Sequence, residues 1–282
     1  MDFEAIAQYK KVIGGISMKI LKKVLLASAV SAGVGFAGAA AAADLAASTP
    51  PSWTGFYAGA NIGYGWDSGS VKSSMRATDP TADGVVAALL AAGSLPRSLS
   101  PSVHGFIGGG QIGYNWQLSD GWLLGAETDL QASGIDDSST AGRVPAGFDP
   151  TLTTVTKKIG WFGTVRGRAG YLITPQWLLY ATAGLAYGDT TIKFSTVDVT
   201  GCVVGGTICA DGSSSSTRVG WTVGGGVEAM LTQNWSVKAE YLYVDLGKKS
   251  ANIASFTSPI VFHSSAHFHE QIVRLGLNYH FE

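Results

Sequence analysis

Histidine is the residue type in this chain best suited to hold a metal or a haem iron. His263, His267 and His269, three of the five histidines, fall within seven residues. Imidazole nitrogens ligate zinc and haem iron, so a metal or haemin site is one hypothesis. The other interpretation is a solvated polar segment, because no cysteine or carboxylate completes a familiar metal spacing. We favour this second interpretation and expect no bound cofactor.

Serines next to these histidines raise the question of catalysis. Ser264 and Ser265 lie between His263 and His267. Transfer or hydrolysis of an acyl chain needs a serine nucleophile, a base and a group that orients the base. Serines stand near histidines by chance in many polar segments. We therefore expect that the protein is not an enzyme and keep a lipid-modifying activity as the least favoured alternative.

The chain has two cysteines, Cys202 and Cys209, seven positions apart. In a secreted protein they meet an oxidising compartment, where two lone cysteines pair. A disulfide that closes a small loop is the prediction, and two free thiols are the alternative. A metal site would need more ligands than this pair supplies.

The start of the chain predicts secretion. Met18 begins the run Met-Lys-Ile-Leu-Lys-Lys, and a short apolar stretch and three alanines follow before Asp44. A basic start, a short apolar stretch and small residues at the cut are typical of a signal peptide. An uncleaved amphipathic anchor at the very start is the alternative. We expect an N-terminal extension at 1–17, a signal peptide at 18–43 and a mature barrel domain at 44–282.

The composition of the mature chain points to a membrane and away from nucleic acid. Five of the 19 basic and two of the 20 acidic residues precede Asp44, which leaves 14 against 18. A net charge near −4 predicts no nucleic-acid partner. Charged residues make up 14% of the chain, against about 25% in soluble domains. No mature segment has the roughly 20 apolar residues of a spanning helix, so a membrane β-barrel fits best.

A repeat shows the strand period. Residues 55–66 and 105–116 share Gly, Phe, Gly, Ile, Gly, Tyr and Trp at the same offsets. Large apolar residues occupy one parity and small or polar residues the other, which is the pattern of a β-strand with one apolar face. That face could lie in a core or against lipid. Its members in the two copies are Phe56, Ile62, Tyr64, Trp66, Phe106, Ile112, Tyr114 and Trp116.

Six further alternating segments follow, which gives eight strands. Their connections alternate between three tight turns and four long polar loops, expected at 67–104, 133–157, 188–217 and 246–267. This rhythm predicts an all-β, eight-stranded antiparallel up-and-down transmembrane barrel. An even strand number places both mature termini in the periplasm. A short helix within 84–92 of the first loop is also expected, bounded by Pro80 and Gly93.

Tryptophans cluster at the ends of the expected strands. Indole has an apolar body and a polar N–H, so it concentrates at the two surfaces of a bilayer. Buried core tryptophans of a soluble β-protein are the alternative, which explains neither the turns nor the clustering. The predicted aromatic girdle comprises Trp53, Trp66, Trp116, Trp122, Trp161, Trp177, Trp221 and Trp235.

Charged residues fall on the opposite parity and should point into the lumen. Eight strands leave an interior that side chains just fill. Unpaired charges there would be costly, so a plug of ion pairs is favoured over a charge-lined narrow pore. The predicted lumen charges are Glu127, Asp129, Arg166, Arg168, Glu228, Lys238, Glu240, Glu270 and Arg274.

Several motifs resemble a known family. They are the opening Trp53-Thr54-Gly55-Phe56-Tyr57-Ala58-Gly59, the segment from Gly163 to Tyr171, the run Glu240-Tyr241-Leu242-Tyr243 and the last strand. Together they resemble the small outer-membrane immunogenic proteins of alphaproteobacteria, porin-family barrels related in shape to the transmembrane domain of OmpA. The resemblance covers essentially all of 44–282. It implies an outer-membrane location and, for some relatives, association with haemin.

The resemblance also implies partners. The last strand, with Phe281 penultimate and Glu282 after it, resembles the signal read by the outer-membrane assembly machinery. Outer-membrane lipid and lipopolysaccharide are the other expected partners of what we expect to be a monomer. We expect a structural, surface-exposed barrel that supports envelope integrity, with little or no passive permeability. A narrow porin for small solutes and a loop-borne haemin or ligand receptor are the alternatives.

Overall fold

A computed structural model of the chain describes residues 51–67, 69–202 and 209–281. They belong to one compact unit, Thr49–Glu282. The expected extension at 1–17 and signal peptide at 18–43 lie outside the described residues, so these two expectations stay predictions. No helix in the described part of the chain is long and apolar enough to cross a membrane.

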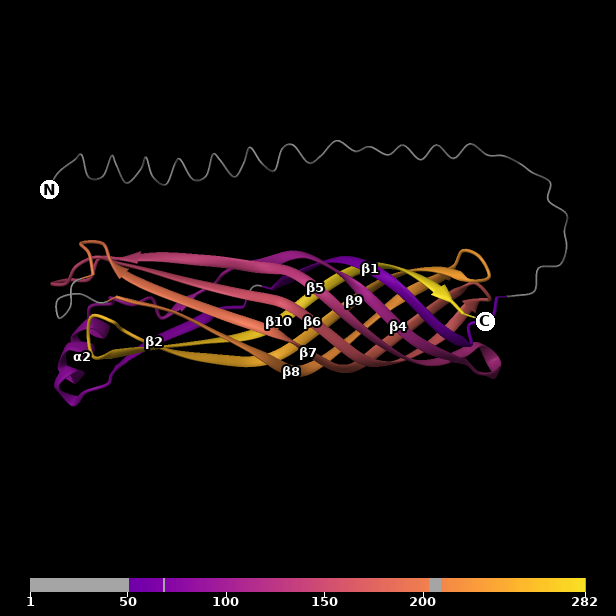
Figure 1. Cartoon of the computed structure of the whole chain (residues 1–282), viewed down its shortest axis with the longest axis horizontal. Coiled ribbons are helices and arrows are strands. Elements are labelled where there is room, and N and C mark those ends of the chain that lie inside the picture. The colour runs from indigo at the N-terminus through magenta and orange to yellow at the C-terminus, as the bar shows by residue number, and fades with distance from the viewer. Residues whose placement is uncertain (1–50, 68, 203–208, 282) are drawn as a thin grey trace, which may run out of the picture. The chain divides into compact units, whose positions relative to one another are not determined.

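The described residues form ten strands, one α-helix and two short 3-10 turns (Figure 1). The strands are β1 (Gly55–Asp67), β2 (Val71–Ala77), β3 (Ser98–Leu99), β4 (Val103–Gln117), β5 (Trp122–Arg143), β6 (Thr151–Thr174), β7 (Trp177–Asp198), β8 (Ala210–Met230), β9 (Trp235–Ala254) and β10 (Ile260–His280). The helix is α2 (Asp83–Ala91), and the turns are η1 (Pro80–Ala82) and η2 (Ser119–Gly121).

The strands form an antiparallel ring. The sheet order is β1-β4-β5-β6-β7-β8-β9-β10-β2-β3, and β1 also pairs with β10. The prediction of eight strands is wrong as a count, because the described chain has ten. Eight of them close the ring, and β2 and β3 extend the sheet beyond β10. The expected first loop contains these two additional strands.

The two copies of the repeat lie side by side in the ring. They form β1 and β4 and pair with each other, with Tyr64 opposite Phe106 and Phe56 opposite Tyr114. Because the strands run in opposite directions, the Phe of each copy lies against the Tyr of the other, with ring centroids 5.3 and 4.7 Å apart. On the inner face Gly113 must lack a side chain, since a Cβ there would overlap the ring of Tyr57.

The strands are longer than expected, and three of the four predicted loops are mostly strand. Residues 133–157, 188–217 and 246–267 extend β5 to β10 to lengths of 20 to 24 residues. These extensions expose Ser and Thr on one face and bury Val, Ile and Phe on the other. Thr is enriched in strands, but runs of Ser and Thr also match the composition of loops, which is why the sequence predicts polar loops there.

The long strands do not continue the ring to their far ends. β8 pairs with β9 only from Trp221 to Met230, and beyond that β8 pairs with β7 alone and β9 with β10 alone. The sheet therefore splits into two facing sheets, β5-β6-β7-β8 and β9-β10-β2-β3. We call this the two-sheet section, and the part where eight strands pair the ring section. Phe194 and Phe262 meet between the two sheets, with ring centroids 5.2 Å apart.

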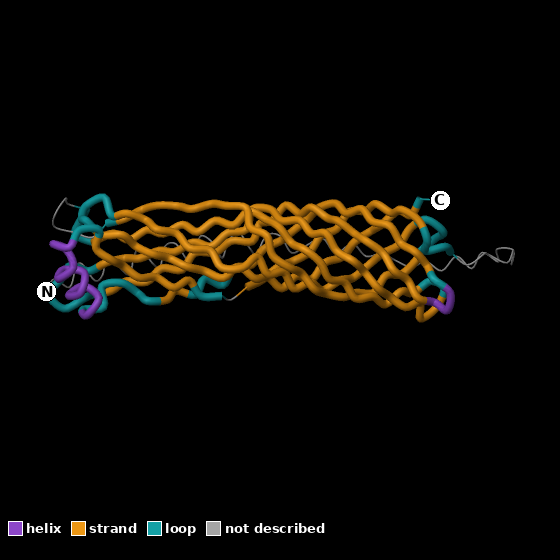
Figure 2. Tube along the Cα trace, turned by 90° about the horizontal axis from the view of Figure 1, so that it is seen from below, coloured by secondary structure: helices purple, strands orange, loops and turns teal. Residues whose placement is uncertain are grey.

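Helix α2 lies at the far end of the two-sheet section, together with the long hairpin turns (Figure 2). Its bounds agree with the helix expected at 84–92. Val86 and Leu89 pack into the apolar core. Before it, Asp79 accepts hydrogen bonds from the backbone and hydroxyl of Thr81, and these bonds lower the pKa of the Asp79 carboxyl. Gly93, with φ of +75°, follows the helix.

The two sections are built with opposite polarity. In the ring section the outward side chains are apolar, such as Phe106 at 72% exposure, and the inward ones are charged. In the two-sheet section the outward side chains are polar and the inward ones form a continuous apolar core. The ring section is therefore made for an apolar surrounding and the two-sheet section for water.

Candidate functional site

The lumen of the ring section holds a cluster of charged side chains from five strands, β5, β6, β8, β9 and β10. Each charge occupies an inward position, alternate with an exposed apolar residue, so the strand period alone directs it to the axis. The structure brings together eight of the nine predicted lumen charges, all buried: Glu127, Asp129, Arg166, Arg168, Glu228, Lys238, Glu240 and Arg274.

Two arginines form the centre of this cluster. Arg166 contacts Glu127, and it donates to Asp129 at 2.9 Å and to Glu240 at 3.0 Å. Arg274 donates to Glu240 at 2.6 Å and to Asp129 at 3.0 Å. Each guanidinium therefore binds carboxylates from different strands, and the pairs bridge the tube from wall to wall.

The remaining charges pair nearer the end where the short turns lie. Arg168 donates to Glu228 at 2.6 Å, and Lys238 donates to Glu127 at 2.7 Å. Arg168 also lies 4.3 Å from the ring centroid of Tyr180, and the hydroxyl of Tyr57 donates to Glu127 at 2.7 Å. Aromatic rings thus fill the space that the ion pairs leave.

This cluster is electrically balanced and buried. It contains four cations and four carboxylates, and all eight residues are at most 4% exposed. A buried ion pair stabilises weakly, but the loss of one partner leaves a buried unpaired charge that costs about 3–5 kcal/mol. The charges of the cluster therefore hold one another in buried ion pairs.

A tryptophan closes the lumen below the charges. Trp53 was expected in the aromatic girdle, and this prediction is wrong: Trp53 has no exposed surface. Its indole nitrogen donates to the carbonyl of Pro175 at 3.0 Å, and its ring packs with Leu123, Leu178 and Met230. Trp53 precedes β1, so the chain is free to fold inward there, which strand parity could not reveal.

The other predicted girdle tryptophans lie on the outer surface in two rows. Trp116, Trp122, Trp177 and Trp235 stand beside the short turns, and Trp161 and Trp221 beside the two-sheet section, with exposures between 39% and 55%. Trp66 is half-buried and belongs to the row beside the two-sheet section. Tyrosines join both rows, such as Tyr171 against Trp122 and Tyr243 against Trp221. The outward apolar surface lies between these rows.

The ninth predicted lumen charge is separate from the cluster. Glu270 is buried above it, and neither carboxylate oxygen has a hydrogen-bond partner among the described residues. Nearby, the side chain of Lys157 forms an ion pair with Asp67 and donates to the carbonyl of His267 at 2.8 Å. The Lys157–Asp67 pair was missed because both residues fall in segments expected to be loops.

The three clustered histidines do not form one site. All three point outward from β10: His263 contacts Asn252 at 2.8 Å, His267 contacts Asp245 at 2.9 Å, and His269 lies 3.0 Å from Asp67. Their rings are not equally close. His267 and His269 have centroids 5.4 Å apart, but His263 is four residues away, roughly 13 Å along the strand. Within the described ranges no three metal-ligating side chains converge. The hypothesis of a site built from all three histidines is therefore wrong.

The serines beside these histidines do not make a nucleophile–base pair. Ser264 is buried and faces the core, whereas His263 and His267 face outward from the same strand. Ser265 faces outward too, but the described hydrogen bonds of both histidines go to other residues. The geometry gives no support to a catalytic serine here.

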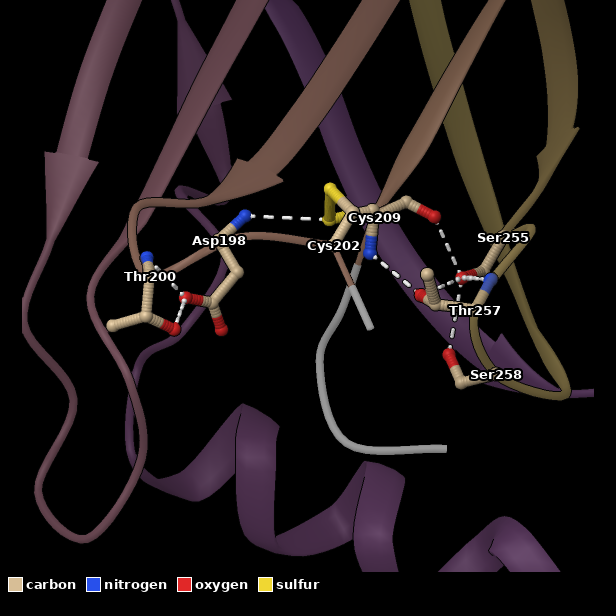
Figure 3. Close-up of a disulfide and its surroundings, with 7 residues drawn as sticks. All are labelled: Asp198, Thr200, Cys202, Cys209, Ser255, Thr257 and Ser258. Carbon is tan, nitrogen blue, oxygen red and sulfur yellow. Dashed lines mark hydrogen bonds between the residues drawn. A yellow bond between two sulfur atoms is a disulfide. The ribbon is translucent and has the colours of Figure 1, made fainter. Parts of the chain in front are cut away.

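The two cysteines are joined in a disulfide, with Cα atoms 5.8 Å apart (Figure 3). The backbone of Cys209 reaches across the split between the sheets. Its N–H donates to the hydroxyl of Thr257 at 3.0 Å, and its carbonyl accepts from Ser255 at 2.7 Å and from the Phe256 N–H at 3.1 Å. The disulfide-bearing turn therefore ties the β7–β8 hairpin to the β9–β10 hairpin.

Comparison with known proteins gives the family. A family model described as outer membrane protein beta-barrel domain matches residues 29–281. The 31 kDa outer-membrane immunogenic protein of Brucella melitensis is 38% identical over 93% of this chain and 100% of its own length. The 22 kDa outer membrane protein of Rhizobium leguminosarum is 37% identical over 56% of this chain and 58% of its own.

Solved structures to which this chain is similar include that of the outer membrane protein OprG of Pseudomonas aeruginosa. It covers 83% of this chain and 99% of its own, with 11% identity and a TM-score of 0.44. Ail of Yersinia pestis covers 81% and 99%, with 13% identity and a TM-score of 0.31. The family assignment rests on the sequence matches, which span nearly the whole described barrel. This chain belongs to the outer-membrane β-barrel protein family and is similar to the outer-membrane immunogenic proteins of Brucella.

Proposed function

We propose that the protein is a closed outer-membrane barrel with a structural, surface-exposed role in the cell envelope and little or no passive permeability. The filled lumen carries this proposal. From the short turns outward, a solute would meet the buried Trp53, then the eight paired charges, then the apolar core of the two-sheet section. The eight charges of the cluster are all held in ion pairs, and Glu270 above them is buried, without a hydrogen-bond partner among the described residues.

The proposed orientation places the short turns and both mature termini in the periplasm. The two tryptophan rows then mark the two membrane surfaces, because indole prefers the headgroup zone. The two-sheet section stands outside the cell, in agreement with its polar outer surface. The word immunogenic in the names of the Brucella relatives also supports surface exposure.

Partners follow from this placement. Outer-membrane lipid and lipopolysaccharide would surround the apolar belt, and the assembly machinery would receive β10, which ends at His280 with Phe281 after it. We infer a monomer and a cleaved signal peptide at 18–43. We also infer no catalytic role, which the separation of Ser264 from the outward-facing histidines supports.

Solute flux into liposomes tests the proposal. Proteoliposomes that contain the full mature chain should swell no faster in isotonic arabinose than protein-free liposomes, whereas a general porin reconstituted in parallel should give fast swelling. Gel mobility with and without boiling verifies that the reconstituted chain is folded. Swelling that grows with the amount of folded protein would show an open lumen and contradict the proposal.

A further inference from the structure

One face of the two-sheet section carries basic residues without acidic ones. The outward face of β9-β10-β2-β3 is built from β2 and from residues 93–103 and 246–269, and these segments contain no Asp or Glu. They contain five Lys or Arg. Of these, Lys249 points inward and donates to the Thr190 carbonyl at 2.6 Å. The four exposed cations, which we call the basic face, are Lys72, Arg76, Arg97 and Lys248.

Strand register sets how the basic face is laid out. Lys248 of β9 pairs with His267 of β10, and Lys72 of β2 pairs with Ser265 two residues further along β10. Neighbouring strands are about 4.8 Å apart and residues rise about 3.3 Å, so the Cα atoms of Lys248 and Lys72 are roughly 12 Å apart. Arg76 lies four residues beyond Lys72, roughly another 13 Å. The spacing suits several separate anionic groups and does not suit one small ion.

The cations of the basic face are free to bind. None of them forms an ion pair with a described acidic side chain, and Asp245, just before this stretch of β9, is paired with His267. Between the cations lie short polar side chains that present hydrogen-bond donors outward: Ser74, Ser250, Asn252, His263 and Ser265.

The opposite sheet has no such bias. The outward face of β5-β6-β7-β8 carries both acidic and basic residues. Asp136 lies directly opposite Lys158, and Asp189 accepts a hydrogen bond from Ser215. Its exposed cations include Arg143, Lys158 and Lys193. The two faces share the same strand architecture and solvent, so the one-sided charge is not a general property of this section.

The height of the basic face identifies the source of the anions. Trp221 of the outer aromatic row pairs with Asp245, and Lys248 follows three residues further along β9, roughly 10 Å from that row. Aromatic rows mark the boundary between hydrocarbon and headgroups. In the proposed orientation the lowest cations therefore stand among the headgroups of the outer leaflet. Exposed cations at that level attract lipid phosphates.

We propose that the basic face of β9-β10-β2-β3 binds the phosphate groups of lipopolysaccharide in the outer leaflet. The two-sheet section would then contact the glycolipid layer through this one face. This inference rests on the proposed orientation. It goes beyond general lipid contact, because it names one face of four strands as the binding surface and phosphate as the recognised group.

Binding to purified lipopolysaccharide tests the inference with matched variants. The full mature chain in detergent is compared with the triple variant Lys72→Gln, Arg76→Gln and Lys248→Gln. The control triple variant, Arg143→Gln, Lys158→Gln and Lys193→Gln, removes the same residue types from the opposite face. We expect about tenfold weaker binding for the first variant, because it loses three exposed ion contacts. Binding of the control variant should be unchanged.

Two further arms identify the recognised group. Dephosphorylated lipopolysaccharide should bind the unmodified chain as weakly as intact lipopolysaccharide binds the first variant. Soluble inositol hexakisphosphate should bind much more weakly than lipopolysaccharide, since the phosphates are held at the height of the membrane.

Equal loss in both variants, or binding that does not depend on phosphate, would overturn the inference. Soluble polyphosphate binding as tight as that of lipopolysaccharide would instead identify a free polyanion as the ligand and also overturn it. Boiling-dependent gel mobility confirms that each variant is folded. The swelling assay is independent of these outcomes, so a failure here leaves the closed barrel standing.

Discussion

At the scale of single residues, each buried charge in the lumen is stabilised by its partners in the cluster, so the loss of one leaves others unpaired. Strand parity predicted all nine inward charges. Successive side chains of a strand point to opposite faces, so a charge between two outward-facing residues must point into the lumen. Parity could not predict their partners, since Arg166 meets Glu127, Asp129 and Glu240 from two other strands. Pairing across a tube depends on the stagger of all eight strands, which no single segment encodes.

Arg166 therefore offers a sharp test of the cluster. Replacement Arg166→Ala leaves carboxylates buried without their central partner, so the free energy of unfolding in detergent should fall by about 3–5 kcal/mol. Lys193 is an exposed residue of the two-sheet section, and its replacement Lys193→Ala should change the free energy of unfolding by less than about 0.5 kcal/mol. Urea titration followed by heat-modifiable gel mobility measures both. Equal stability of the two variants would show that the lumen charges are hydrated rather than paired.

At the scale of elements, sequence and structure differ mainly in where strands end. The turns were predictable because each is short, is directly followed by a tryptophan and interrupts a clear alternation. The far ends were not, because segments such as 211–218 are rich in Ser and resemble loop. Long-range packing decides there: inward residues such as Ile192 and Val155 reach the shared apolar core and hold the segments as strands.

The disulfide belongs to this scale because it closes the turn from which Cys209 hydrogen-bonds the β9–β10 hairpin, beyond the residues where β8 and β9 pair. In the double variant Cys202→Ser and Cys209→Ser we expect a loss of about 2 kcal/mol, the value for a small closed loop. The amides of Cys209 and Phe256, which take part in the contact between the hairpins, should exchange hydrogen faster. Amides of the ring section, such as that of Arg166, serve as the control. Unchanged exchange at Phe256 would show that the hairpins hold without the bridge.

At the scale of the whole molecule, the chain changes from inside-out to conventional packing along its length. The ring section hides charge and exposes apolar side chains, and the two-sheet section does the reverse. The tryptophan rows mark the limits of the first section, and the sequence located these limits correctly for seven of the eight tryptophans. Trp53 differs because it closes the lumen instead of touching lipid. Among the described residues, the ion pairs fill the lumen of the first section and the apolar core fills the space between the two sheets of the second.

Single-channel recording in planar bilayers tests the closed lumen most directly. The mature chain, reconstituted in a form whose gel mobility changes on boiling, should add no discrete current steps to the bare bilayer over a range of voltages. A general porin inserted under the same conditions supplies the positive control. Reproducible steps of uniform size, which scale with the amount of folded protein, would contradict the closed barrel and assign the protein a conducting role.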